Sequence, residues 1–180
     1  MSLQHILLGF LREESGSGYD LNKRLDAQAK HFWTTEQSQI YRALYRMQAA
    51  DWVEFQTVIQ ANSPNKKVYN LTEKGNAELE RWLREPTEET LPSHIWLAKL
   101  YIGQNLDYAD VAQIIKERRA TMGEYRLWVL LRRRLIDQKN SDDTETVLRL
   151  LTLDHTLRLI DTEISWFDST IEKLQALLEA

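Results

Sequence analysis

Residues 34–53 combine hydroxyl, amide and guanidinium groups in a pattern that predicts a single helix with two contrasting sides. Four apolar residues recur at helical spacing and should be buried: they are Ile40, Ala43, Leu44 and Met47. The residues on and beside the opposite side are Thr35, Ser38, Gln39, Tyr41, Arg42, Tyr45 and Arg46. No carboxylate occurs between Glu36 and Asp51. Such a surface can hydrogen-bond base edges and phosphates without repelling a nucleic-acid duplex.

The start of this helix is indicated by Thr34, which is followed three residues later by Gln37. This spacing predicts a capping box, so we expect the helix to begin at residue 34. The alternative interpretation is that its polar side is an ordinary solvated surface. The neighbouring elements favour nucleic acid.

Two helices are predicted before this one, over residues 2–12 and after Ser17, which can cap the second. After Asp51 the sequence becomes rich in β-branched and aromatic residues, at 52–58 and 67–71, which predicts a β-hairpin. The turn-forming residues 62–66 give it a charged tip with Asn65, Lys66 and Lys67. Thr72 should cap a fourth helix that ends before Pro86. Three helices and a hairpin predict a winged helix-turn-helix, whose third helix suits the major groove and whose hairpin suits the adjacent backbone.

A set of short motifs supports this interpretation. They are residues 6–11 (ILLGFL), 17–21 (SGYDL), 32–33 (FW), 39–44 (QIYRAL), 52–53 (WV) and 67–75 (KVYNLTEKG). In this order and spacing they resemble the PadR family of bacterial transcriptional regulators over residues 1–85. The resemblance implies a homodimeric repressor, with Tyr41 and Tyr69 near the DNA backbone and Lys66 or Lys67 on the wing. The family usually has proline where this chain has Arg42, and it usually has glycine near Asp51. This chain should therefore prefer a different DNA sequence from its relatives.

The remainder of the chain is predicted to be helical. Residues 88–92 are acidic, lie between prolines and suggest a linker, followed by a domain over residues 92–180. Helices are expected over 93–103, from Asp107 toward Gln138, and to the end of the chain. The last of these carries an apolar seam spaced alternately three and four residues apart: Leu150, Leu153, Leu157, Ile160, Ile164, Phe167, Ile171, Leu174 and Leu178.

Resemblance to the family's longer members implies that this half is a dimerisation domain. Its candidate contact residues are Leu157, Ile160, Ile164, Phe167, Ile171 and Leu174. The alternative is a helical bundle formed within one chain. The predicted fold is therefore mainly α: a winged helix-turn-helix followed by an all-helical, coiled-coil-like dimerisation domain.

Tryptophans occur in both halves. Trp33, Trp52 and Trp82 occupy apolar positions and should belong to the N-terminal core. Trp96, Trp128 and Trp166 could either pack the C-terminal helices or line a pocket for a small aromatic or hydrophobic effector. The resemblance strengthens the second interpretation, because some members of the PadR family respond to phenolic acids or hydrophobic drugs.

Composition narrows the function further. The net charge of −4 argues against indiscriminate nucleic-acid binding, yet residues 1–72 are near neutral, with eight Lys/Arg and seven Asp/Glu.

The chain has no cysteine, no apolar run of membrane-spanning length and no signal peptide, so we expect a cytoplasmic protein without membrane association. Its four histidines are widely separated and it has no phosphate-binding glycine loop, so we expect no metal, no cofactor and no enzyme activity. The competing class is a winged-helix module that docks on protein instead of DNA.

Overall fold

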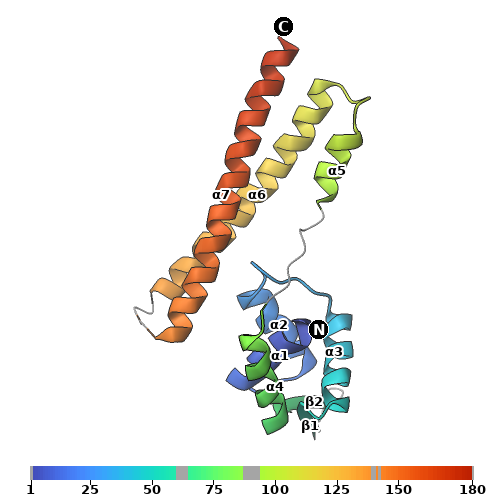
Figure 1. The fold of residues 1–180 in the computed structure, drawn as a ribbon, viewed down its shortest axis with the longest axis vertical. Helices are drawn as coiled ribbons and strands as arrows, with labels where there is room; N and C mark the ends of the chain where they lie inside the picture. Colours follow the sequence, from blue (N-terminus) through green and yellow to red (C-terminus); the bar gives the residue numbers. More distant parts are fainter. Residues whose placement is uncertain (1, 60–64, 87–93, 139–140, 142, 180) are drawn as a thin grey trace. The chain divides into compact units, whose positions relative to one another are not determined.

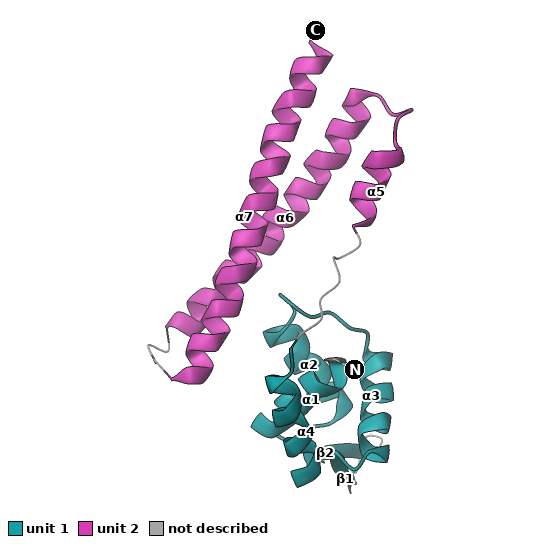
Figure 2. Ribbon diagram, viewed as in Figure 1, with its two compact units in different colours: residues 1–89 teal, residues 90–180 magenta. Residues whose placement is uncertain are grey.

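The computed structural model describes residues 2–59, 65–86, 94–138, 141 and 143–179 (Figure 1). The chain forms two compact units, residues 1–89 and residues 90–180 (Figure 2). The predicted linker at 88–92 and residues 62–64 of the predicted hairpin tip lie outside the described residues.

Unit 1 is a winged helix-turn-helix. Its elements are α1 (Ser2–Glu13), α2 (Gly18–Gln28), α3 (Gln37–Ala49), β1 (Val53–Val58), β2 (Lys66–Leu71) and α4 (Glu73–Arg84). The two strands pair antiparallel, from Val53 opposite Leu71 to Val58 opposite Lys66, which confirms the predicted hairpin. An isolated bridge between Gly16 and Tyr69 fastens this wing to the turn before α2.

The caps of α2 and α4 agree with the sequence. Ser17 and Asp20 form a reciprocal capping box at the start of α2, and the Thr72 hydroxyl accepts a hydrogen bond from the Gly75 N–H at the start of α4. These bonds satisfy amide groups that a first helical turn leaves unpaired.

The predicted capping box at Thr34 is wrong. The first helical N–H groups of α3 donate to the carbonyl of Glu36, so the helix begins at Gln37 and Glu36 caps it without a side-chain bond. The second helix was expected to run to about Phe32 and Trp33, but it ends at Gln28. Phe32 and Trp33 then both donate their N–H groups to the Ala29 carbonyl, which makes a compact turn in place of further helix.

The core of unit 1 lies between its helices and the wing. The buried side of α3 is formed, as predicted, by Ile40, Ala43, Leu44 and Met47. These residues share a cluster with apolar side chains of α1, α2 and α4, against which Trp33, Trp52 and Trp82 are partly buried. Removing this surface from water is the main term that fixes the orientation of α3.

Unit 2 consists of α5 (Ile95–Ile102), α6 (Tyr108–Asp137) and α7 (Thr144–Leu178). Asp107 caps α6 as predicted, and Asp143 caps α7. The two long helices lie side by side (Figure 2), joined by ion pairs such as Arg119–Asp168 and Arg126–Asp161. None of the helices described by the structure is both long and apolar enough to cross a membrane.

The apolar seam of α7 packs against α6 of the same chain. Leu157, Ile160, Phe167 and Leu174 are buried in one cluster with α6 residues such as Ile115 and Val129, and Ile164 and Ile171 are partly buried there. Helical periodicity indicates that such a stripe needs a partner without identifying it. Most of this seam is consequently covered within one chain, so a second chain would need another apolar surface.

Candidate nucleic-acid interface

The outer face of α3, which we define as Ser38, Gln39, Tyr41, Arg42, Tyr45 and Arg46, is exposed along its whole length. Tyr45 is 75% exposed and Tyr41 47% exposed, although both are large aromatic residues. Thr35 lies just before the helix, half-buried, and its hydroxyl donates to the Gln39 side-chain oxygen. The buried stripe therefore directs the predicted polar groups of α3 outward.

Arg42 and Arg46 differ from most arginines of the chain. Within the described residues, neither guanidinium has a hydrogen bond or an ion pair. Arg24, by contrast, donates to the backbone carbonyls of Phe10 and Glu14, and Arg81 pairs with Glu78. A guanidinium carries five N–H donors, so these two arginines can bind an external acceptor without breaking an internal bond.

Two tyrosines join α2, α3 and the wing. A Cβ atom at Gly18 would lie 2.6 Å from Tyr41 Cε1, so only glycine allows the start of α2 to approach this ring so closely. Tyr69 is only 7% exposed, and burial, followed by the neighbouring Tyr41, raises the pKa of its hydroxyl. Both rings line a cleft of about 580 Å³ together with Asn65, Lys66 and Lys67. The structure thus brings these five predicted residues together.

The two lysines of the wing have partners inside the chain. Lys66 Nζ lies 3.1 Å from Asp20 Oδ2, and Lys67 Nζ lies 4.0 Å from the centroid of the Phe55 ring. The pKa of Asp20 is lowered to about 2, first by the backbone N–H and hydroxyl of Ser17 and then by Lys66. Asp20 was not predicted as a site residue: its spacing from Ser17 suits a helix cap, but no sequence signal connects it to Lys66. The Lys66–Asp20 contact holds the wing against α2.

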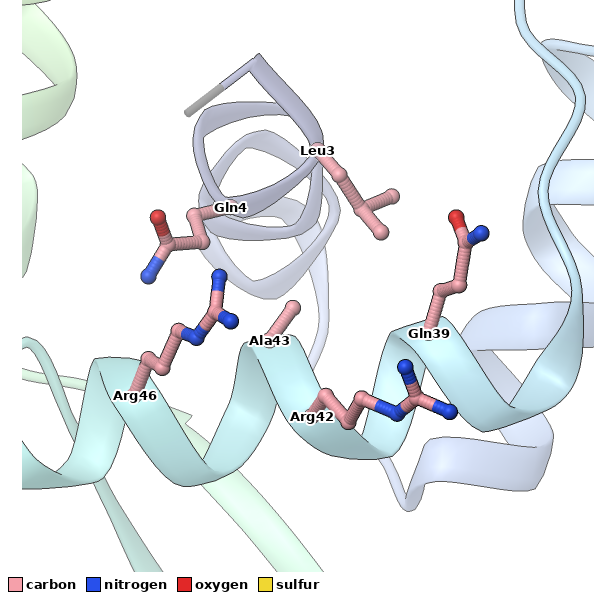
Figure 3. Close-up of a pocket in the computed structure, with 6 residues that line it drawn as sticks. All are labelled: Leu3, Gln4, Gln39, Arg42, Ala43 and Arg46. Carbon is pink, nitrogen blue, oxygen red and sulfur yellow. The ribbon is translucent and has the colours of Figure 1, made fainter.

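A shallow groove separates α3 from the first turn of α1. Its lining residues, shown in Figure 3, are Leu3, Gln4, Gln39, Arg42, Ala43 and Arg46. Neither Leu3 nor Gln4 was predicted as a site residue. Only the packing of α1 across α3 brings Gln4 beside Arg46.

In unit 2 the three candidate effector residues divide into two groups. The ring centroids of Trp96 and Trp166 are 5.5 Å apart, and Phe167 lies 5.4 Å from each. Trp128 instead stacks on Tyr125, with a centroid distance of 6.0 Å. The guanidinium carbon of Arg118 lies 6.0 Å from the Trp96 ring.

Two donors in the Trp96 group are buried without an acceptor. Among the described residues, neither Trp96 Nε1 nor Arg118 Nε has a hydrogen-bond partner. Leaving a buried N–H unpaired is unfavourable by roughly 1–3 kcal/mol. An acceptor supplied from outside the chain would remove this penalty.

Unit 2 also exposes leucines that face away from its core. Leu127, Leu131 and Leu135 follow one another at a four-residue spacing on α6 and are 57–63% exposed. Leu148, Leu151 and Leu159 on α7 are 57–59% exposed. We call these six residues the outer leucines. Exposed apolar surface of this kind is typical of an interaction site.

Comparison with known proteins gives matches to both units. The PadR-like family of transcriptional regulators matches residues 7–81, and the C-terminal family of virulence activator alpha matches residues 94–175. A probable transcriptional regulator of Mycobacterium tuberculosis is 32% identical over 97% of this chain and 98% of its own length. The negative transcriptional regulator PadR of Bacillus subtilis is 32% identical over 64% of each chain.

Solved structures of Bacillus subtilis PadR share the fold. The complex of that protein with operator DNA has a TM-score of 0.79 at 24% identity, over 97% of this chain and 99% of that one. Its complex with p-coumaric acid has a TM-score of 0.78 at 23% identity, with the same coverage. With the family match in unit 1 and a relative that aligns over nearly the whole of both sequences, this chain belongs to the PadR-like family of transcriptional regulators.

Proposed function

We propose that this protein is a sequence-specific DNA-binding repressor that acts in the cytoplasm as a homodimer on a palindromic operator. The observation that carries the proposal is the outer face of α3, where Arg42 and Arg46 have no partner among the described residues. An exposed cation without an internal partner gains most from a polyanion, because binding releases counterions from the DNA without costing an internal bond. The repressor role is supported by the similarity to a negative regulator.

The candidate DNA-binding residues of unit 1 fall into two sets, those that would contact bases and those that would contact the sugar-phosphate backbone. Residues of α3 would enter the major groove, where Ser38, Gln39 and Arg42 offer the hydroxyl, amide and guanidinium groups that read base edges. The remaining groups would contact the sugar-phosphate backbone and fix the register without reading sequence: they are Thr35, Tyr41, Tyr45, Arg46, Asn65, Lys66, Lys67 and Tyr69.

A dimer is proposed because one winged helix contacts only one half-site. Two copies held about one turn of DNA apart, roughly 34–36 Å, would read a palindrome, and the second contact would become effectively intramolecular. The outer leucines are exposed in the single chain and supply a candidate surface for the second copy. The seam of α7, from Leu157 to Leu174, would act indirectly by holding α6 and α7 in place.

Selection of fragments from the source genome tests the main proposal. We expect the full-length protein to enrich fragments that share an inverted repeat, and titration should show binding to the repeat at least about a thousandfold tighter than to unrelated DNA. A protein-docking module would instead bind all fragments equally weakly. Equal binding to the selected and scrambled fragments would therefore reject specific DNA recognition.

A second proposal concerns an effector. The neighbouring Trp96 and Trp166 rings, whose planes are inclined by 59°, and the unpaired N–H groups of Trp96 and Arg118 would suit a flat aromatic acid whose carboxylate accepts both bonds. The complex of Bacillus subtilis PadR with p-coumaric acid gives a compound to begin with.

Tryptophan fluorescence tests the effector proposal. We expect p-coumaric acid or a related phenolic acid to quench emission of the wild type and to weaken operator binding, and DNA should weaken acid binding by the same factor. Arg118→Gln should lose the acid response while retaining operator affinity. If a panel of aromatic acids changes neither signal, these rings only pack the helices.

A further inference from the structure

The groove between α1 and α3 has a volume of about 270 Å³ and is open beside the outer face of α3. Figure 3 shows Arg46 and Gln4 facing each other from the two helices. Arg42 and Gln39 lie further along α3, and the small side chain of Ala43 lies between the two arginines. Two guanidinium groups and two amides thus surround one opening.

The chemistry of this opening selects an anion. Its lining contains two cations and no carboxylate, and neither guanidinium has a partner within the described part of the chain. The wing differs, because Asp20 already neutralises Lys66 there. A guanidinium fork matches two oxygens of a phosphate, and an amide N–H₂ can donate to a third.

The position of the groove selects the kind of anion. It shares Gln39, Arg42 and Arg46 with the outer face of α3, so a duplex bound to that face would pass its backbone close to the opening. We propose that the groove seats one phosphate of the DNA backbone, held by Arg46 and by the side-chain amide of Gln4. This proposal rests on the DNA-binding function proposed above and adds α1 to the interface.

The two arginines would then have different roles, Arg46 binding a phosphate and Arg42 binding a base. Arg46 would be fixed on the phosphate, which sets how deeply α3 enters the major groove. Arg42 would stay available for a base edge. Gln4 would contact the same phosphate and would therefore affect binding equally for all operator sequences.

Replacing Gln4 with glutamate tests the proposal. Gln4→Glu places a carboxylate opposite Arg46, where it would pair with the guanidinium and repel the phosphate. We expect operator affinity to fall about tenfold or more, and the slope of log K against log salt to become shallower by roughly 0.9 per half-site. Gln175→Glu is the matched control, because it makes the same charge change at an exposed position on α7. It should bind like the wild type.

Single methylphosphonate substitutions along the operator give an independent reading that does not depend on the fold of a Gln4 variant. Neutralising the phosphate in the groove should weaken binding by the wild type but leave binding by Arg46→Gln almost unchanged, whereas other phosphates should affect both proteins equally. If no phosphate shows this coupling, or if Gln4→Glu retains wild-type affinity and salt slope while Arg42→Gln weakens binding, the groove proposal is wrong. If the wild type prefers no operator at all, the DNA-binding proposal fails first.

Discussion

Arg119 and Arg126 of α6 meet carboxylates of α7, whereas Arg42 and Arg46 of α3 meet none among the described residues. Arg119 Nε lies 2.8 Å from Asp168 Oδ1, and Arg126 Nε lies 2.5 Å from Asp161 Oδ1. Arg119 also lowers the pKa of Asp168. Exposed pairs of this kind stabilise a fold only weakly, because water and salt screen them. Each pair neutralises one arginine of unit 2, while Arg42 and Arg46 keep their charges available to an outside anion.

The same contrast occurs inside unit 1. Lys66 is held by Asp20 and Lys67 lies over the Phe55 ring, so part of the attraction of these lysines for DNA is offset by the internal contacts they would loosen. Arg42 and Arg46 have no such offset. We infer that α3 contributes more of the binding free energy than the wing, and that the wing is held in position before DNA arrives.

The largest expected effect on operator binding follows from removing both α3 charges. Arg42→Gln with Arg46→Gln should weaken operator binding by about a hundredfold or more at moderate salt, because a dimer loses four cations. The thermal unfolding midpoint should stay near that of the wild type, since no internal bond is lost. Fluorescence anisotropy and a thermal melt measure the two quantities. A large loss of stability with unchanged affinity would show that Arg42 and Arg46 stabilise the fold and do not bind DNA.

The next pair of variants compares a core residue of unit 2, whose loss should lower stability, with an outer leucine, whose loss should weaken the dimer. Phe167 is completely buried, so Phe167→Ala should cost about 3–5 kcal/mol in the unfolding free energy of unit 2. Leu131 is 63% exposed. Leu131→Asp should leave the helices folded but shift the protein toward monomer in sedimentation. If Leu131→Asp remains fully dimeric, the outer leucines do not form the dimer surface.

A smaller effect concerns acid stability. The pKa of Glu78 is lowered to about 2 by Arg81 and then by His5, the latter through a 2.9 Å contact at a buried ring. A lowered pKa means that the stabilisation is complete above the unfolded value of 4.5 and is lost as the pH falls toward 2. Glu78→Gln should therefore flatten the decline of unit 1 stability between about pH 5 and pH 2. An unchanged decline would show that Glu78 contributes little.

The smallest effect should come from a paired arginine of unit 2. Arg126→Gln removes one exposed ion pair and should leave the thermal unfolding midpoint close to that of the wild type, because solvent screens such a pair. Operator affinity should remain within about twofold of the wild type, because the pair lies outside the proposed interface. A loss comparable to that of the α3 variant would mean that net charge, and not the position of the arginines, controls binding.

Local signals predicted much of the fold. The buried stripe of α3 and the caps at Ser17, Thr72 and Asp107 depend on residues within one turn of each other, and the structure confirms them. The true start of α3 was not predicted, because the spacing of Thr34 and Gln37 fits a capping box, whereas the first helical backbone bonds begin at the Glu36 carbonyl. The partner of the α7 seam could not be predicted from its spacing, which is the same whether α6 or a second chain covers it.

The candidate site was predicted only in part, because some of its contacts join residues that are far apart in the sequence. Its α3 residues share one helical face and can be identified from a short window of sequence. The pairing of Asp20 with Lys66 and the approach of Gln4 to Arg46 join segments far apart in the chain. Such contacts follow from helix packing, which spacing along the sequence does not encode.

The salt dependence of operator binding tests the central claim most directly. If cations of α3 and the wing neutralise backbone phosphates in both half-sites, a plot of log K against log salt should have a slope of about −4 or steeper. The variant lacking both Arg42 and Arg46 charges should give a clearly shallower line on the same operator. A wild-type affinity that does not change with salt, or identical slopes for the two proteins, would contradict the claim that these arginines are held available for DNA.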